Sequence, residues 1–306
     1  MPFPTQAGTP SYSGTFIPEI WSKKLIEKFY DATVLSAISN TDYEGEIREQ
    51  GDKVKIRTVP TLAINDYASG QTLVNQRPVS NIVELSVDQG KYWSAICDDV
   101  QHVQADIGMM NLWANDASEQ MKISIDTSVL GNIVADFAAA NKGATAGRIS
   151  GNINLGVAGT PLVVTKANIL DTLIDMGQVL DEQNIAEQGR FLLMPFWATA
   201  LLKKSDLKDA SLTGDGTSVL RNGRLGMIDR FTIYQSNNLP WATEGSARAF
   251  YMFAGHKSGL TFASQLTKTE TLRAESTFGD IMRGLQVYGY KVVNPVTLTA
   301  TYAVKG

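Results

Sequence analysis

Few side chains in this sequence have a type and spacing that could run a reaction. The chain has only two histidines, His102 and His256, and they are far apart. A catalytic triad would need one of them as its base, and no Gly-x-Ser-x-Gly turn is present to hold a nucleophilic serine. Neither histidine has a second metal ligand at a useful spacing. The sequence therefore predicts neither nucleophilic catalysis nor a metal site.

A glycine-rich run and a row of carboxylates are the remaining candidates for chemistry. Residues 214–218 (GDGTS) have the composition of a phosphate-binding loop, but they lack its closing Gly-Lys-Ser/Thr, so a plain turn is favoured. The carboxylates Asp42, Glu44 and Glu46 alternate along an extended segment and are interpreted as solvated or paired with basic groups. We expect no enzymatic activity and no cofactor.

Composition indicates a globular chain with no membrane segment. Its 306 residues are 43% apolar and 19% charged, enough for one large core or two to three sub-domains. The net charge of −4 argues against a dedicated nucleic-acid-binding protein, which would normally be basic. No signal peptide and no run of about 18 apolar residues is present, so we expect synthesis in a reducing cytoplasm. Cys97, the only cysteine, has apolar neighbours, which favours a buried, inert thiol over a reactive one.

The longest regular pattern is an amphipathic stretch over about 99–141, inside a gap without proline between Pro78 and Pro161. Its apolar residues recur at steps of four and three, which predicts a helix with one buried face, formed by Val103, Ile107, Met110, Ala114, Ala117, Met121 and Ile125. Such a helix would be a rod of roughly 50–60 Å. A single long rod in a chain that otherwise favours β-structure predicts a flat, extended subunit suited to tiling.

Two short segments, 52–59 and 82–88, alternate in the manner of half-buried strands. An antiparallel pair would place the basic side chains of Lys53, Lys55 and Arg57 across from acidic ones such as Glu84. About 20 residues with little regular pattern separate the strands, with a tip expected around Asn65, Asp66 and Tyr67. Because a two-stranded ribbon is only marginally stable alone, we expect it to lie on another molecule.

The rest of the chain divides into an N-terminal arm and a mixed helix and strand region. Residues 1–16 are rich in Pro, Gly, Ser and Thr, and Pro18 opens a short helix whose apolar face is Trp21, Leu25 and Phe29. After a loop over 141–159, we expect helices from Thr165 to about Asp181 and from Pro195 to about Lys204, and a polar loop over 205–224. The expected strands are 191–194, 231–235, 250–254, 285–290 and 296–304.

Two stretches, taken together, resemble the major capsid proteins of tailed bacteriophages. The first comprises residues 17–22 (IPEIWS), 40–47 (NTDYEGEI) and 51–56 (GDKVKI), and the second comprises 222–231 (NGRLGMIDRF) and 234–240 (YQSNNLP). Ile125-Asp126 followed by Leu130 also resembles that family. The pair Asp229-Arg230 departs from its pattern because a glycine is common there, which bears on a turn geometry.

The resemblance implies an α+β fold of the Hong Kong 97 type. It implies an N-terminal arm and short helix over 1–45, an extended loop (E-loop) over 46–90, a peripheral (P) domain over 91–149 that holds the spine helix, an axial (A) domain over 150–270, and a C-terminal return to the P-domain sheet over 271–306. Some relatives carry a long scaffolding segment at the N-terminus. Only residues 1–16 precede the first helix here, which implies a separate scaffolding protein.

The implied function is that of a shell subunit. The resemblance implies self-assembly into hexamers and pentamers of an icosahedral virion shell around double-stranded DNA, assembled in the host cytoplasm. The implied partners are a scaffolding protein, a portal protein, a decoration protein and non-specifically contacted DNA, with no membrane. An encapsulin-type shell protein is the alternative, and a monomeric enzyme or binding module a distant one. The expected inter-subunit contacts are Trp21, Leu25, Phe29, Lys53, Lys55, Arg57, Asn65, Asp66, Tyr67, Glu84 and Asp215.

Overall fold

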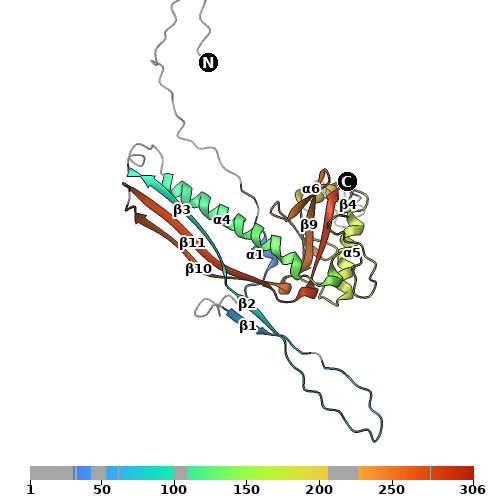
Figure 1. The fold of residues 1–306 in the computed structure, drawn as a ribbon. Coiled ribbons are helices and arrows are strands. Elements are labelled where there is room, and N and C mark those ends of the chain that lie inside the picture. The colour runs from blue at the N-terminus through green and yellow to red at the C-terminus, as the bar shows by residue number, and fades with distance from the viewer. Residues whose placement is uncertain are drawn as a thin grey trace, which may run out of the picture.

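The computed structural model describes residues 30–31, 33–42, 53–60, 62–99, 109–205, 227–275 and 277–306. Two parts lie side by side (Figure 1). The elongated part consists of the long helix α4 (Met109–Ile133) and three long strands. The compact part is a seven-stranded sheet with helices α5 (Ile169–Glu182) and α6 (Phe196–Lys204). The molecule is mixed α and β, as predicted.

The sheet of the elongated part is antiparallel, in the order β10-β11-β3. Its strands are β3 (Gln89–Asp98), β10 (Leu260–Arg273) and β11 (Gly279–Val292), and a bulge interrupts the β10–β11 register between Ser264 and Leu266. The expected strand 285–290 lies inside β11. Strands β3 and β10 were not predicted. In β3 the apolar residues stand side by side instead of alternating with polar ones, and in β10 threonines and charged residues leave few apolar positions. Cys97 on β3 is buried, as predicted.

Helix α4 lies along this sheet, with its apolar stripe turned inward. Ala114, Ala117 and Met121 are half-buried, and Ile125 is fully buried. Three further buried residues, Val129, Leu130 and Ile133, continue the stripe by one or two turns. The predicted amphipathic helix is thus confirmed over α4, while residues 100–108 lie outside the described part of the chain.

The prediction that this helix continues to Asn141 was wrong. The α-helix ends at Ile133 and two short 3-10 turns follow, η1 (Val134–Asp136) and η2 (Ala139–Asn141). Phe137 between them has an extended backbone, with ψ at 146°. The ammonium of Lys142 accounts for this ending, because it donates to the carbonyls of Val134 (2.8 Å) and Ala135 (2.9 Å) that a continuing helix would use.

The seven-stranded sheet is covered on both faces. It runs β4-β12-β9-β5-β7-β6, with β8 paired to β9, and comprises β4 (Leu162–Val164), β5 (Arg190–Met194), β6 (Met227–Ile228), β7 (Phe231–Gln235), β8 (Trp241–Glu244), β9 (Ala247–His256) and β12 (Leu298–Lys305). Leu192 and Met194 share a core with α5 and α6. Phe191 and Leu193 pack instead with the C-terminal half of α4. All five residues of β5 are therefore buried.

Most of the other expected elements are present, with shifted ends. Pro195 stops β5 and α6 ends at Lys204, as predicted. Helix α5 begins at Ile169 rather than at Thr165, because the side chain of Asn168 first closes a turn by accepting from the Thr165 amide at 2.7 Å. The short turns η4 (Lys257–Gly259) and η5 (Pro295–Thr297) join the two sheets.

A short hairpin and helix α1 (Leu35–Ile38) complete the fold. The hairpin pairs β1 (Lys53–Arg57) with β2 (Ile82–Ser86) in antiparallel register, which confirms the predicted ribbon. Its base packs on the same chain: its apolar side chains share a small core with Ala263 and Val287. The contact is close, because a Cβ at Gly289 would lie 2.2 Å from the carbonyl oxygen of Ser86. Only the segment beyond the strands leaves the body of the molecule (Figure 1).

Candidate functional site

The loop that joins β1 to β2, residues 58–81, reaches away from the rest of the chain (Figure 1). At its base the amide of Thr58 donates to the carbonyl of Asn81 at 2.9 Å. Further out, the side-chain amide of Gln76 binds both backbone groups of Ala63, at 3.0 and 2.7 Å. The described residues of its two legs form no strand pairing of their own. The two legs of the loop are therefore bound to each other at these two places and are otherwise uncovered.

Apolar side chains are unusually exposed along this loop. Ile64 and Val59 are each 93% exposed, and the whole set is Val59, Leu62, Ile64, Tyr67, Leu73, Val74 and Val79. A scattered exposed apolar residue needs no explanation, but a dense group marks a surface that another molecule covers. These residues lie on the two legs of the loop, on either side of the turn at Ala68–Gln71.

The predicted contact residues of this region are all exposed, but they do not meet at one point. Lys53, Lys55, Arg57 and Glu84 lie on the outward face of the β1–β2 hairpin. Lys55 opposes Glu84 in the register, with 3.7 Å between the ammonium and a carboxylate oxygen, as the charge pattern predicted. Both groups are well exposed, so this pair contributes at most about 1 kcal/mol.

Asn65, Asp66 and Tyr67 lie on the outgoing leg of the loop rather than at its tip. The chain reverses at Ala68–Gln71, where the amide of Gln71 donates to the carbonyl of Ala68 at 3.0 Å. Gly70 allows this turn because its φ is 84°, a left-handed value that other residues rarely adopt. The other predicted contact residues, Trp21, Leu25, Phe29 and Asp215, and the glycine-rich run 214–218, lie outside the described residues.

A groove of about 530 Å³ lies on the β10-β11-β3 sheet. Side chains alternate along a strand, so Arg283 and Leu285 project from the face opposite the one on which Tyr288 packs with α4. The groove combines exposed Tyr92 and Leu285 with a charged group of Lys268, Glu270 and Arg283. A hydrogen bond from Lys268, supported by one from Arg283, lowers the pKa of Glu270. This surface was not predicted, because two of its strands, β3 and β10, were not predicted.

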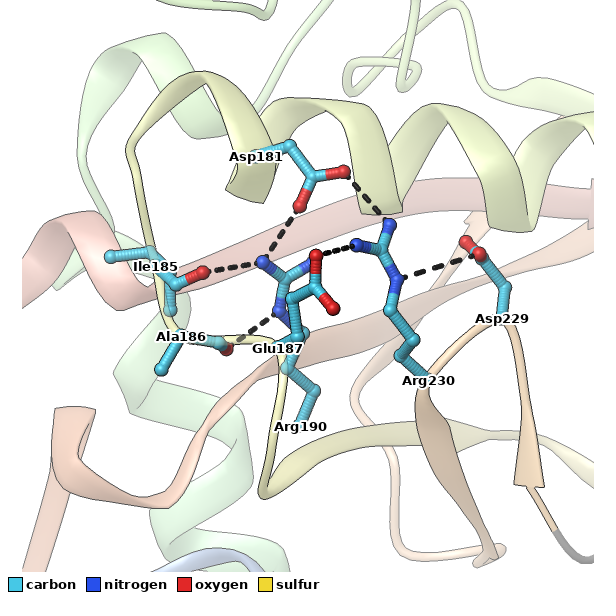
Figure 2. Close-up of polar contacts among 7 residues, drawn as sticks. All are labelled: Asp181, Ile185, Ala186, Glu187, Arg190, Asp229 and Arg230. Atoms are coloured by element: carbon cyan, nitrogen blue, oxygen red, sulfur yellow. Dashed lines mark hydrogen bonds and ion pairs between the residues drawn. The ribbon is translucent and has the colours of Figure 1, made fainter.

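An ionic cluster ties α5 to strands β5 and β7 (Figure 2). The guanidinium of Arg190 is buried and donates to the carbonyls of Ala186 (2.9 Å) and Ile185 (2.6 Å). It also lies 2.7 Å from one carboxylate oxygen of Asp181, whose other oxygen accepts from Arg230 at 2.9 Å. Arg230 reaches Glu187 as well, at 2.7 Å.

This cluster holds the tight turn between β6 and β7 in an unfavourable backbone conformation. Asp229 and Arg230 both have positive φ, 44° and 68°, as the two-residue hairpin turn requires. Neither residue is glycine, although a glycine is common at this position in the family that the sequence resembles. Burial opposes ionisation of Asp181, but hydrogen bonds from Arg190 and Arg230 outweigh it and hold its pKa below the ordinary value. Apart from the departure at the turn, no pattern in the sequence indicates this cluster.

Neither a metal centre nor a membrane span is found in the part of the chain that the structure describes. No three His, Cys, Asp or Glu side chains there are grouped so that they could bind a metal ion. No helix among the described residues combines the length and apolar character needed to cross a membrane.

Comparison with known proteins gives one family and many similar structures. Residues 95–304 match the family described as phage capsid protein. No curated protein matches the sequence.

The structural similarity extends over nearly the whole chain. A structure from Mycobacterium phage Che8 is 24% identical, with a TM-score of 0.76 over 95% of this chain and 98% of that one. The capsid structure of the cyanophage P-SCSP1u is 14% identical, with a TM-score of 0.72 over 95% and 94%. The mature capsid of bacteriophage PhiM1 is 16% identical, with a TM-score of 0.69 over 94% and 91%. At these identities the likeness shows the fold, which is the Hong Kong 97 type predicted.

Proposed function

Because the chain belongs to the phage capsid protein family, we propose that it is the major subunit of the icosahedral shell of a tailed phage. In this proposal the chain forms hexamers and pentamers that enclose double-stranded DNA in the virion. Its role is structural rather than enzymatic. The location in the virion follows from the family, and assembly in the host cytoplasm is part of the proposal.

The observation that carries the proposal is the uncovered loop 58–81. Its apolar legs have no partner within the described chain, and only the base of its hairpin packs on the same molecule. A free subunit that leaves such a surface in water is stabilised when a neighbour covers it. Repeated around a closed symmetry, many contacts of this kind limit growth to a shell.

The proposed division of the chain follows the implied one, with one boundary moved. We assign 1–45 to the arm and short helix, 46–90 to the E-loop and 91–149 to the P domain. Strand β10 pairs with β11 along its length, which favours ending the A domain near residue 259 rather than 270. The C-terminal region then contributes β10 and β11 to the P-domain sheet.

The proposed partners include a separate scaffolding protein, a portal protein and a decoration protein. Contact with the packaged DNA is expected to be non-specific and weak, because the chain is net acidic and the DNA must leave the shell. A few inward-facing lysines and arginines would then bind phosphates with a strong dependence on salt. A sequence-specific footprint on duplex DNA would contradict this part of the proposal.

The proposal is tested by weakening the loop without touching the body of the subunit. Ile64→Ser with Val74→Ser removes two side chains that are 93% and 82% exposed. We expect the variant to fold normally, judged by circular dichroism, and to give far fewer megadalton particles in size-exclusion chromatography when co-expressed with scaffolding protein. The matched control, Thr72→Ser with Asn75→Ser, changes two exposed polar neighbours that are not among the predicted contact residues, and it should assemble like the wild type. Normal particle yield from the apolar variant would contradict the proposed role of the loop.

A further inference from the structure

A buried carboxylate joins three parts of the chain that are far apart in sequence. Asp126 lies on α4 and is 1% exposed. One of its oxygens accepts hydrogen bonds from the backbone amides of Val34 (3.1 Å) and Leu35 (2.9 Å). The other accepts from the side-chain amide of Asn238 at 2.9 Å. Asp126 therefore binds the start of α1 on one side and the turn between β7 and β8 on the other.

The two regions that meet at Asp126 belong to different parts of the fold. Residues 33–40 run from α4 to β10, where Asn40 exchanges backbone hydrogen bonds with Leu260 and Phe262 at 2.9 and 3.0 Å. Asn238 follows β7 in the seven-stranded sheet. The resemblance had singled out both Ile125-Asp126 and the stretch 234–240, and the structure brings them into contact.

Among the described residues, neutral donors surround the charge of Asp126. They are two backbone amides and one side-chain amide, and none of the three carries a charge. Burial raises its pKa, and the hydrogen bonds from Asn238, Val34 and Leu35 act in the opposite direction. The apolar side chains of Val34, Leu35, Ile125 and Leu239 form one core around it, which excludes water. A buried carboxylate in this setting needs every donor it has.

We propose that Asp126 couples the seating of residues 33–40 on α4 to the docking of the 236–240 turn on the same helix. Each donor makes the buried charge tolerable for the others. When one side of the junction opens, the carboxylate retains fewer hydrogen bonds, and the other side is weakened as well. The coupling is reciprocal, since both contacts share one group. It goes beyond the proposed function, because it is a property of the single subunit.

The dependence on charge distinguishes this coupling from simple packing. Only the ionised carboxylate requires all three donors, so the coupling is expected above the pKa of Asp126 and is lost once the group is protonated. The amide in Asp126→Asn carries no charge and should remove the coupling at every pH. A contact that acted through packing alone would not change with protonation.

The test is a double-mutant cycle read at single amides. Amide hydrogen exchange, corrected for the intrinsic effect of pH, is measured at Val34 and Leu35 in the full-length unassembled chain. Asn238→Ala should lower their protection about tenfold at neutral pH, a coupling typical of groups in one hydrogen-bond network. In the Asp126→Asn background the same change should alter protection by less than about twofold. An equal loss of protection in both backgrounds, or no loss in either, would overturn the proposal.

Two controls and a second readout keep the test decisive. Asp116→Asn changes a half-buried carboxylate of α4 that accepts from the hydroxyl of Tyr30, and it should leave the 236–240 turn unaffected. Leu239→Ala removes packing beside the junction. Its effect on the exchange protection of the Val34 and Leu35 amides should be the same in the wild-type and Asp126→Asn backgrounds. If Asn238→Ala folds poorly, Asn238→Leu preserves the volume. In that variant the carboxyl resonance of Asp126 should titrate at a higher pH than in the wild type, and an unchanged titration would count against the coupling.

Discussion

Arg230 offers the sharpest test of how this fold holds its strained turn. Its φ of 68° is left-handed, which costs a residue with a Cβ roughly 1–2 kcal/mol. The guanidinium binds Asp181 at 2.9 Å and Glu187 at 2.7 Å, so its ion pairs hold in place a turn that the backbone disfavours. Arg230→Ala removes the ion pairs and retains the strain, whereas Arg230→Gly removes both.

The expected magnitudes follow from exposure and backbone geometry. The side chains of Arg230 and Asp181 are 36% and 41% exposed, so solvent screens the pairs and Arg230→Ala should cost about 1 kcal/mol. Arg230→Gly loses the same ion pairs but relieves the backbone strain, which stabilises the folded state. Against this, glycine destabilises the folded state by roughly 0.4–1 kcal/mol, because it has greater freedom in the unfolded chain. The glycine variant should therefore be more stable than the alanine variant by up to about 1.6 kcal/mol.

Urea denaturation of the unassembled subunit, followed by circular dichroism, measures this difference. Lys204→Ala is the matched control, because it removes a cation at the end of α6 that takes no part in the cluster. High salt should narrow the gap between wild type and Arg230→Ala, since the pairs are screened. If Arg230→Gly is no more stable than Arg230→Ala, the turn is not strained and the reasoning is refuted.

Three further predictions concern loop 58–81, the close contact at Gly289 and the hydrogen bond between Ile149 and Glu182. Amides of residues 58–81 should exchange rapidly in the free subunit and become protected in particles, and equal exchange in both states would contradict a role in assembly. Gly289→Ala should destabilise the subunit by about 1–3 kcal/mol in thermal denaturation, because its Cβ would lie 2.2 Å from the carbonyl oxygen of Ser86; an unchanged melting temperature would show that the contact yields. The amide of Ile149 binds Glu182 at 2.7 Å and leads the contacts that lower the pKa of Glu182 to about 2 from its ordinary 4.5. The ionised carboxylate of Glu182 should thus contribute its full stabilisation above pH 4.5 and lose it as the pH falls through 2. The melting temperatures of wild type and Glu182→Gln should therefore converge in acid. A constant difference between them would argue against the bond.

Particles should not be covalently cross-linked through loop 58–81. Some capsid proteins of this fold join a lysine of the E-loop to a neighbouring asparagine, but residues 58–81 contain no lysine. The nucleophile for such a bond is a lysine amine, which arginine cannot replace because its guanidinium stays protonated. Boiling particles in detergent should give one band near 33.3 kDa on a denaturing gel, whereas a ladder of multimers would contradict this prediction.

Local periodicity was enough to predict the elements that have one apolar face. The β1–β2 hairpin, including the Lys55–Glu84 pair, follows from alternation alone, and the stripe of α4 follows from steps of three and four. Strand β10 was missed because threonines and charges fill it, and its pairing with β11 supplies the order that its own pattern lacks. The end of α4 was misplaced because the side chain of Lys142 donates to the carbonyls of Val134 and Ala135, which directly follow the helix.

The polar contacts depend on tertiary proximity and could not be predicted from the sequence. Arg190 gave no signal, since its partners lie on a helix and a loop that only folding brings around it. Asp126 and Asn238 are 112 positions apart and were noted only as separate parts of a resemblance. The exposed legs of loop 58–81 were also missed, because their apolar residues follow no helix or strand period.

Cryo-electron microscopy of the chain co-expressed with the proposed scaffolding protein tests the central claim most directly. The account predicts closed icosahedral shells whose subunits have the α4 and β10-β11-β3 arrangement, with loop 58–81 covered by a neighbouring subunit. Soluble monomers alone, under conditions in which related coat proteins assemble, would contradict it.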